Sequence, residues 1–227
     1  MEALPIARAS RRRFNPFLTI ALVTNGKSAG IAGTVQAIRL YHPEHLALVE
    51  FLVLDEDPTT PDSAALSALE KSVPGYRYIP APGFQGRTAR DRVFVEAAGE
   101  FVLVLAPETF LLPGALGTLI NYLMANRDSI DLLHGVKVVD DLSKAQTQLE
   151  PVWSGTDFGR WAPPSVLVQR EPFEISLQPL DVFVVRRTLW PQPNPDFLGV
   201  SDVPGYVQDQ VRRAGGRVLC LPFLKWT

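Results

Sequence analysis

The sequence predicts a single α/β domain with a mostly parallel sheet flanked by helices. Four short, mainly apolar runs have the length and composition of strands buried in such a sheet, and they lie at Leu18 to Val23, Val49 to Leu54, Tyr76 to Ile79 and Phe101 to Leu105. Helical patterns separate these runs, as in successive βαβ units. The 227 residues are 46% apolar and 20% charged, which suits one folded core of this class.

The helices of the first half are predicted from the segments between these strands. They are expected at Thr34 to Tyr41, at Ser63 to about Ser72 with Ser63 as the cap, at Thr88 to Ala98, and at Ala115 to Ala125. The acidic stretch Asp55 to Pro58 is predicted to be a turn.

The second half has a less regular pattern. Strands are expected at Leu132 to Val139, Val182 to Val185 and Val218 to Leu221, and a helix at about Gly205 to Ala214. Gly215 and Gly216 are predicted to end this helix, and Asp140 to Glu174 is predicted to be rich in loops.

The topology predicts where a ligand would bind. Parallel sheets of this kind bind ligands at the carboxyl ends of their strands. The turns that follow the first, second and fourth strands begin at Thr24, Asp55 and Ala106. We therefore expect these three residues to lie along one edge of the sheet.

Charge and cysteine content narrow the function classes. The 22 basic and 24 acidic residues give a net charge of -2, which argues against a dedicated nucleic-acid binder. Cys220 has no partner for a disulfide in this chain, which favours a cytoplasmic location. No apolar run is long and continuous enough to predict a transmembrane helix.

Several segments resemble family 2 nucleotide-sugar glycosyltransferases, in particular a bacterial and phage subgroup. The segment GEFVLVLAPETFLLPGAL at Gly99 to Leu116 resembles the family's central strand and the helix that follows it. The resemblance continues in DDL at Asp140, PVW at Pro151, EPFEI at Glu171 and GGRVLCLPFLKW at Gly215. It implies the Rossmann-like GT-A fold.

The resemblance also implies positions for the family's chemistry, and this chain departs from the pattern there. The DxD-type motif, whose carboxylates hold a divalent metal, corresponds to Ala106, Pro107 and Glu108. The acidic base loop reads GVSDVPGY from Gly199, so Asp202 is its remaining carboxylate. Asp202 is either a displaced base or an ordinary turn and cap residue.

Two function classes follow from these departures. The favoured one is a glycosyltransferase-like domain that has lost catalysis and serves as a structural or interaction subunit, with no metal and no intact catalytic residue. The alternative is an active transferase that uses Glu108 or Asp202 and binds a nucleotide sugar and a divalent metal.

Nucleotide binding is compatible with either class. The candidate residues are Thr24, Asn25, Asp55, Asp57 and Arg90. The competing interpretation is ordinary turn chemistry for the polar residues after the strands, and surface ion pairs for Arg87, Arg90 and Arg92.

The first 16 residues are predicted to be a basic tail, and residues 17–227 the GT-A-like domain. Arg11, Arg12 and Arg13 lie beside Phe14 and Phe17, which combines charge with apolar area for binding a protein partner in a larger assembly. The competing interpretation of the arginines is a solvated tail.

Histidine, cysteine and tryptophan patterns predict structural roles. His42, His45 and His134 have no ligand spacing shared with a cysteine or an acidic cluster, so zinc is not expected. Cys220 lies in an apolar run and is predicted to be a small core residue. The four tryptophans are expected mostly in the core.

Overall fold

The computed structural model describes residues 15–24, 29–82, 87–129, 131–141, 146–151, 170–175, 182–190 and 203–227. Within them, nine strands form one sheet in the order β3-β2-β1-β4-β8-β5-β9-β7, with β6 paired to β5. The strands are β1 (Leu18–Thr24), β2 (Val49–Asp55), β3 (Tyr76–Pro80), β4 (Phe101–Leu105), β5 (Leu132–Asp141), β6 (Gln146–Pro151), β7 (Phe173–Glu174), β8 (Phe183–Arg186) and β9 (Val218–Trp226). The helices are α1 (Ala29–Tyr41), η1 (Pro43–Leu48), α2 (Pro61–Ala68), η2 (Leu69–Lys71), α3 (Arg87–Glu96), α4 (Ala115–Ala125), η3 (Arg187–Leu189) and α6 (Val203–Arg213).

The first half of the chain forms the parallel part of the sheet. Strands β3, β2, β1 and β4 pair in parallel, with Thr24 opposite Asp55 and Leu22 opposite Leu105. Because Ala106 follows Leu105, it lies at the same edge as Thr24 and Asp55, which confirms the predicted arrangement. Antiparallel pairing begins where β8 joins β4, and β5 then pairs in parallel with β9. The predicted α/β class, with helices flanking the sheet, is confirmed.

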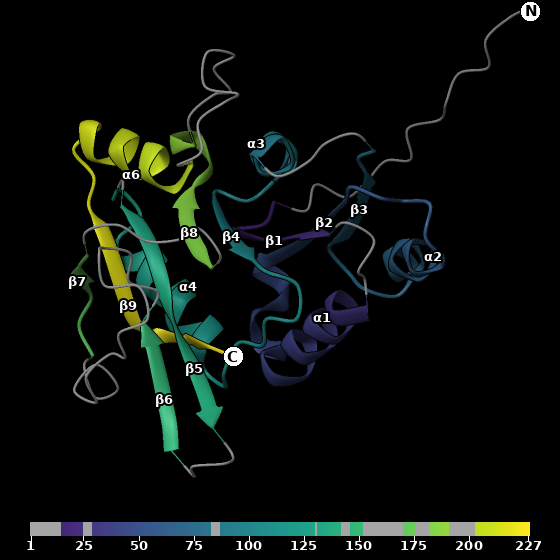
Figure 1. Ribbon diagram of the computed structural model, residues 1–227, viewed down its shortest axis with the longest axis horizontal. Helices are drawn as coiled ribbons and strands as arrows, with labels where there is room; N and C mark the ends of the chain where they lie inside the picture. The colour runs from purple at the N-terminus through teal and green to yellow at the C-terminus, as the bar shows by residue number, and fades with distance from the viewer. Residues whose placement is uncertain are drawn as a thin grey trace, which may run out of the picture.

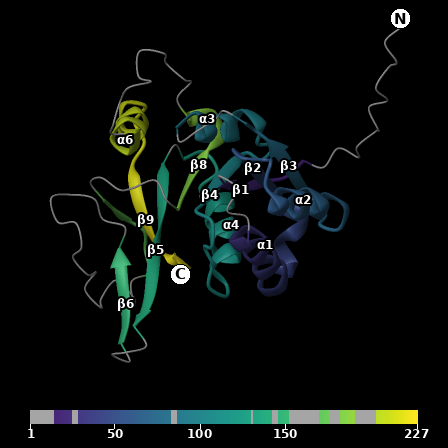
Figure 2. The same ribbon diagram turned by 45° about the vertical axis from the view of Figure 1, so that its right-hand side comes forward.

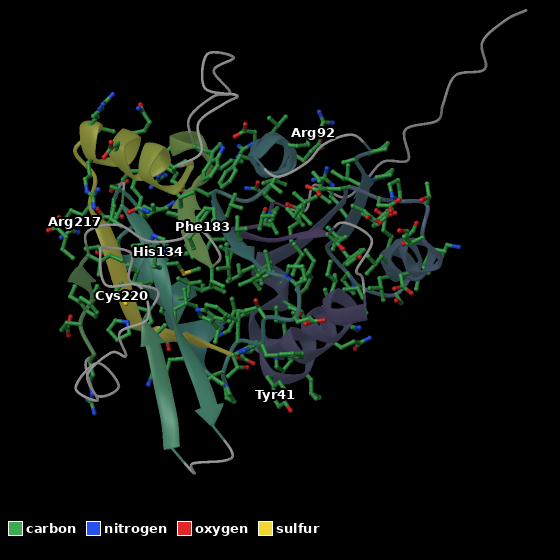
Figure 3. The ribbon with its side chains drawn as sticks, in the orientation of Figure 1. Tyr41, Arg92, His134, Phe183, Arg217 and Cys220 are labelled. Carbon is green, nitrogen blue, oxygen red and sulfur yellow. The ribbon has the colours of Figure 1, made fainter. Side chains whose placement is uncertain are left out.

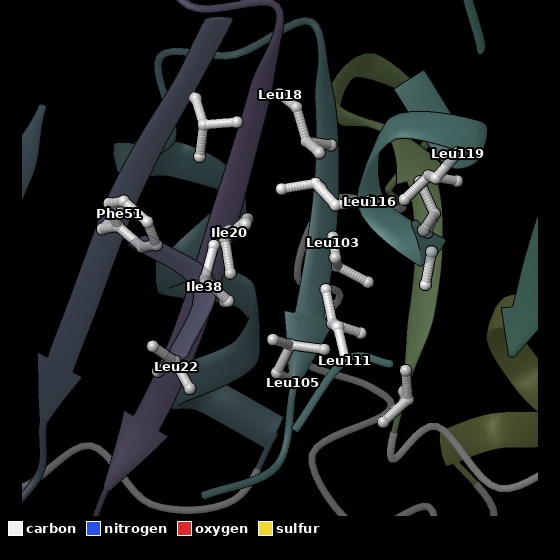
Figure 4. Packing of buried hydrophobic residues seen from close by; sticks show 14 of the residues in the cluster. Leu18, Ile20, Leu22, Ile38, Phe51, Leu103, Leu105, Leu111, Leu116 and Leu119 are labelled. Carbon is white, nitrogen blue, oxygen red and sulfur yellow. The ribbon is translucent and has the colours of Figure 1, made fainter. Parts of the chain in front are cut away.

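Helices cover both faces of the sheet (Figure 1). Alternate residues of β1 point to opposite faces, since the side-chain period of a strand is two. Leu18, Ile20 and Leu22 belong to one buried cluster, together with Ile38 of α1 and with residues of α4. Figure 4 shows this packing around Ile38. Ala21 points to the other cluster, which contains residues of α3 and α6. Burial on both faces explains why the β1 run is apolar at almost every position.

Two elements are five residues longer than predicted. Helix α1 begins at Ala29 and not at Thr34. The last strand continues from Leu221 to Trp226, past Pro222, whose missing N–H suggests the end of a strand. The pairing of β9 with β5 passes through an irregularity here: His134 lies opposite Cys220, whereas Val136 lies opposite Lys225. This bulge accommodates the proline within the strand.

The segment predicted to be loop-rich contains strands. β5 continues to Asp141, β6 covers Gln146–Pro151, and β7 covers Phe173–Glu174. The polar sequence of β6 carries no strand signal, and backbone pairing with β5 holds it in place. Both views show the β5–β6 hairpin extending away from the parallel strands (Figures 1 and 2).

Helix α6 lies close to its predicted position and ends as predicted. Gly215 has a φ of 84°, in the left-handed region that glycine adopts without strain. Its N–H and that of Gly216 donate to the carbonyls of Arg212 and Val211, which satisfies the end of the helix. No helix among the described residues has the length and apolar character needed to cross a bilayer.

Candidate ligand site at the carboxyl edge of the sheet

Asp55, at the end of β2, is the centre of a buried hydrogen-bond network. Its side chain is fully buried. Oδ2 accepts hydrogen bonds from Ser63 Oγ at 2.5 Å and from the Tyr78 hydroxyl at 2.6 Å, and Oδ1 accepts one from the Asp57 N–H at 3.1 Å. Burial, followed by the hydrogen bond to Asp55, raises the pKa of Tyr78 to about 12, so the phenol stays protonated and donates. The carboxylate thereby ties β2 to β3 and α2.

The network corrects the prediction that Ser63 caps α2. The cap is Thr60, whose side-chain oxygen accepts a hydrogen bond from the Ser63 N–H. Ser63 lies inside the helix, and its hydroxyl donates to Asp55. Thr60 and Ser63 are both good cap residues. The residue types alone therefore do not decide which of the two is the cap. The structure decides it, because the Ser63 hydroxyl hydrogen-bonds to the buried carboxylate of Asp55.

Thr24, at the end of β1, presents a buried hydroxyl at the same edge. Its side chain is 2% exposed, and Oγ1 has no hydrogen-bond partner among the described residues. The backbone carbonyl of Thr24 accepts a hydrogen bond from the Glu56 N–H at 2.8 Å, which holds the turn after β2 against β1. Asp57, in that turn, is exposed, and its Oδ1 accepts a hydrogen bond from the Thr59 hydroxyl at 2.6 Å. This part of the edge therefore contains a buried hydroxyl without a described partner, at Thr24, and a solvent-exposed carboxylate, at Asp57.

The segment Ala106 to Thr109 forms a tight turn after β4. The Thr109 N–H donates to the carbonyl of Ala106. Pro107 occupies the second position, and Glu108 at the third has a φ of 67°. Proline followed by a residue of positive φ is the pattern of a type II turn. Glutamate adopts this conformation only under strain, so contacts elsewhere must hold it.

Packing against the start of α1 holds Glu108. A Cβ placed on Gly30, the second residue of α1, would lie 2.1 Å from Glu108 Cγ and 3.0 Å from the Glu108 nitrogen. The absence of a side chain at Gly30 is therefore what allows the turn to approach the helix so closely. A carboxylate beside a helix N-terminus is also electrostatically favourable. These contacts give Glu108 a structural role at this edge.

Replacing Gly30 with alanine should destabilise the domain by about 1–3 kcal/mol, because the added methyl group forces the turn or the helix to shift. Gly33→Ala is the matched control. Its Cβ would meet Phe110 at an ordinary 3.8 Å, so it should stabilise the helix by about 0.5–1 kcal/mol. Urea unfolding of both variants checks the prediction, and equal effects at the two positions would contradict it.

The carboxyl-terminal residues reach this edge as well. Phe110 and Thr227 exchange two backbone hydrogen bonds, of 3.1 and 3.0 Å, and the Leu112 N–H donates to the carbonyl of Lys225 at 2.9 Å. Backbone hydrogen bonds to the end of β9 therefore hold residues 110–112, which follow the Ala106 to Thr109 turn, in place. No local sequence signal indicates this pairing, because it joins segments more than a hundred residues apart.

The donor set does not fit a divalent metal at this turn. Such ions prefer several oxygen ligands. Ala106 and Pro107 contribute no side-chain ligand, and Glu108 contributes one carboxylate. Across the part of the chain that the structure describes, no three histidine, cysteine, aspartate or glutamate residues are grouped so as to hold a metal ion.

The remaining candidate residues are Arg90, Phe17 and six residues outside the described part of the chain. Arg90 belongs to the first turn of α3. Phe17 packs on Phe101 with ring centroids 5.4 Å apart, so it is part of the domain as well as a candidate contact for a partner. Six predicted site residues lie outside the described residues: Arg11, Arg12, Arg13, Phe14, Asn25 and Asp202.

Several predicted structural roles are confirmed. Arg92 forms an ion pair with Glu96 on the surface of α3. Trp190 and Trp226 are buried in the core, whereas Trp153 and Trp161 lie outside the described residues. Cys220 is buried and free. Burial raises the pKa of the Cys220 thiol to about 12, which makes it unreactive at neutral pH.

Comparison with solved structures identifies the fold. A crystal structure of GalNAc-T7 with UDP, GalNAc and Mn2+ has a TM-score of 0.70 and 12% identity, over 92% of this chain and 42% of that one. The mannosyltransferase PcManGT from Pyrobaculum calidifontis, in complex with GDP-Man and Mn2+, has a TM-score of 0.62 and 14% identity, over 94% of this chain and 57% of that one. S. aureus TarS 1–349 has a TM-score of 0.61 and 14% identity, over 92% of this chain and 59% of that one.

The sequence comparisons add no closer relative. No protein-family model matches the chain, and a search of curated proteins finds no match. The chain spans between 42 and 59% of the length of the structures it resembles. At 12 to 14% identity the likeness concerns the fold. This chain has the GT-A fold of glycosyltransferases.

Proposed function

We propose that this chain is a glycosyltransferase-like domain without metal-dependent sugar transfer, which binds nucleotides at its carboxyl edge and serves as an interaction subunit of a larger assembly. The observation that carries the proposal is the turn Ala106 to Thr109. By the resemblance it corresponds to the DxD-type motif, where it offers one carboxylate side chain, and the Cγ of that side chain packs against Gly30.

The chemistry of sugar transfer explains why this turn matters. Transfer from a nucleotide sugar releases a diphosphate, whose developing charge a divalent metal commonly neutralises. Two of the similar structures were determined with Mn2+ and with UDP or GDP-Man. Nucleotide binding at the carboxyl edge of this chain is supported by Thr24, whose hydroxyl lies there without a partner among the described residues. Metal binding does not, because Ala106 and Pro107 lack ligands.

One observation favours a second candidate, an active transferase that works without the metal. Glu108 is exposed at the carboxyl edge, so a substrate hydroxyl can reach its carboxylate. A carboxylate so placed is able to act as the general base for an attacking hydroxyl. Asp202 remains a candidate for the same role, outside the described residues.

We expect the full chain to release no nucleotide from UDP-N-acetylgalactosamine or GDP-mannose above the buffer rate, with Mn2+ or with EDTA. UDP and GDP should bind with affinities that EDTA leaves unchanged, because no described ligand set requires a metal. A coupled assay of nucleotide release and a calorimetric titration measure the two quantities.

The outcomes separate the two candidates. Turnover that EDTA abolishes would overturn the proposal. Turnover that resists EDTA and is lost in Glu108→Gln would establish the second candidate in its place. Asp62→Asn is the control for the charge change, because Asp62 is an exposed carboxylate of α2. Absence of nucleotide binding in every condition would remove the nucleotide-binding part of the proposal.

A further inference from the structure

A pocket lies at the amino edge of the sheet, opposite the candidate ligand site. Its volume is about 340 Å³, within the range of small-molecule sites. Four separate segments form it: the residues before β1, the residues before β4, the end of α4, and the β8–η3 junction. The lining residues are Asn15, Pro16, Phe17, Ala98, Glu100, Arg127, Arg186, Arg187 and Thr188.

The lining is positively charged. It contains three arginines and one carboxylate, that of Glu100. Arg127 Nε donates to Glu100 Oε2 at 2.8 Å, and Arg186 Nη1 donates to Oε1 at 2.6 Å. The hydrogen bond from Arg127 and the nearby charge of Arg186 lower the pKa of Glu100, which is therefore ionised at neutral pH. Glu100 thus neutralises one of the three guanidinium charges that line the pocket.

Arg187 is the arginine that Glu100 does not reach. Its Nη1 donates to the backbone carbonyl of Ala97 at 3.2 Å. Its Nε is buried and has no partner among the described residues. A buried N–H of a charged group without an acceptor is unfavourable, because the water it loses is not replaced. Arg187 therefore lines the pocket with a guanidinium charge that no carboxylate among the described residues neutralises.

The walls of the pocket are held in place before any ligand binds. The guanidinium of Arg186 lies 4.9 Å from the centre of the Phe101 ring, and Phe17 packs on the same ring. The Arg187 N–H donates to the carbonyl of Glu100 at 2.9 Å, which fixes the start of η3 against β4. A preformed arrangement of this kind reduces the entropy lost on binding.

We propose that this pocket binds an oxyanionic group, phosphate or carboxylate, through Arg187 and Arg186. Guanidinium groups are well suited to such anions, because their N–H donors are arranged as a planar fork. The group comes either from a small phosphorylated molecule or from an acidic side chain of a protein partner. The site is separate from the nucleotide edge, so it does not depend on the proposed function.

The test measures anion binding to the full chain and to two variants. Arg187→Gln removes the guanidinium charge, and it is expected to weaken inorganic phosphate binding at least tenfold. Arg92→Gln is the matched control, because Arg92 is an arginine of α3 whose ion pair with Glu96 lies outside the pocket. It should bind as the wild type does. Circular dichroism checks that the variants are folded, and Arg187→Lys provides a milder change that keeps the charge.

Titration followed by 15N NMR of the arginine Nε groups locates the site, because the Arg187 resonance should shift on binding. A parallel titration uses a short glutamate-containing peptide. Tighter phosphate binding identifies a small phosphorylated ligand, and tighter peptide binding identifies an acidic protein segment; both support the site. Absence of saturable binding with either probe, or equal weakening in Arg187→Gln and Arg92→Gln, would overturn the proposal.

Discussion

Replacing Glu50 with alanine is expected to destabilise the domain by about 3–5 kcal/mol. The side chain is 2% exposed on β2. Its Oε2 accepts hydrogen bonds from Thr19 Oγ1 at 2.7 Å and from the Ala98 N–H at 2.8 Å, and its Oε1 accepts one from Arg77 Nη1 at 2.8 Å. Alanine would take this acceptor from the Thr19 hydroxyl and the Ala98 N–H, and it would remove the more deeply buried of the two carboxylates that pair with Arg77.

Two further variants make the measurement specific. Glu50→Gln keeps the size of the side chain and one acceptor, so its effect should be smaller than that of Glu50→Ala. Glu96→Ala removes another carboxylate that pairs with Arg77, but one that is 21% exposed, so its effect should stay below about 1 kcal/mol. Urea unfolding at pH 7.5 compares the three. A Glu50→Ala protein within about 1 kcal/mol of wild type would contradict the expected role of the network.

The free energy of unfolding is expected to fall by about 1.4 kcal/mol for each pH unit below 6.5, because of His134. His134 lies on β5 opposite Phe183 and Cys220 (Figure 3), and neither of its ring nitrogens has a partner among the described residues. Burial lowers its pKa to about 3. The unfolded chain therefore binds a proton near pH 6.5 that the folded protein does not bind until about pH 3, so stability is lost as the pH falls between these values.

His134→Leu should reduce this pH dependence by one proton and leave stability at pH 7.5 unchanged or higher, because it removes two buried polar atoms without partners. His45→Gln is the control at a histidine whose side chain is 21% exposed. Burial also lowers the pKa of His42, which contributes in the same direction and remains in both variants. Urea unfolding at pH 4.5 and 7.5 measures the difference. The same pH dependence in wild type and His134→Leu would show that His134 is not the group responsible.

The parallel half of the sheet could be predicted from the sequence because its information is local. β1, β2 and β4 are apolar at nearly every position, and this follows from burial on both faces. The strand order then places Thr24 and Asp55 at one edge, since parallel strands leave no other arrangement. The GT-A resemblance, based on motifs spread over the chain, is confirmed at the level of the fold.

The later strands could not be predicted in the same way, because their stability is not local. β6 has a polar sequence and exists through backbone pairing with β5. β9 continues beyond Pro222 because its pairing with β5 is interrupted by a bulge between His134 and Val136, where the proline needs no pairing N–H. Pairing between distant segments overrides local preference in both cases.

By itself, the sequence determined which residues stand at the carboxyl edge and that Ala106 and Pro107 have no metal ligand to offer. Only the tertiary structure decided what those residues do. In the structure, Asp55 accepts hydrogen bonds from Ser63 and Tyr78, and Glu108 packs against Gly30. It also assembles the amino-edge pocket from four segments far apart in the chain. The physical reason is that a side chain's partners depend on close packing between distant segments, and no periodic pattern in the sequence records that packing.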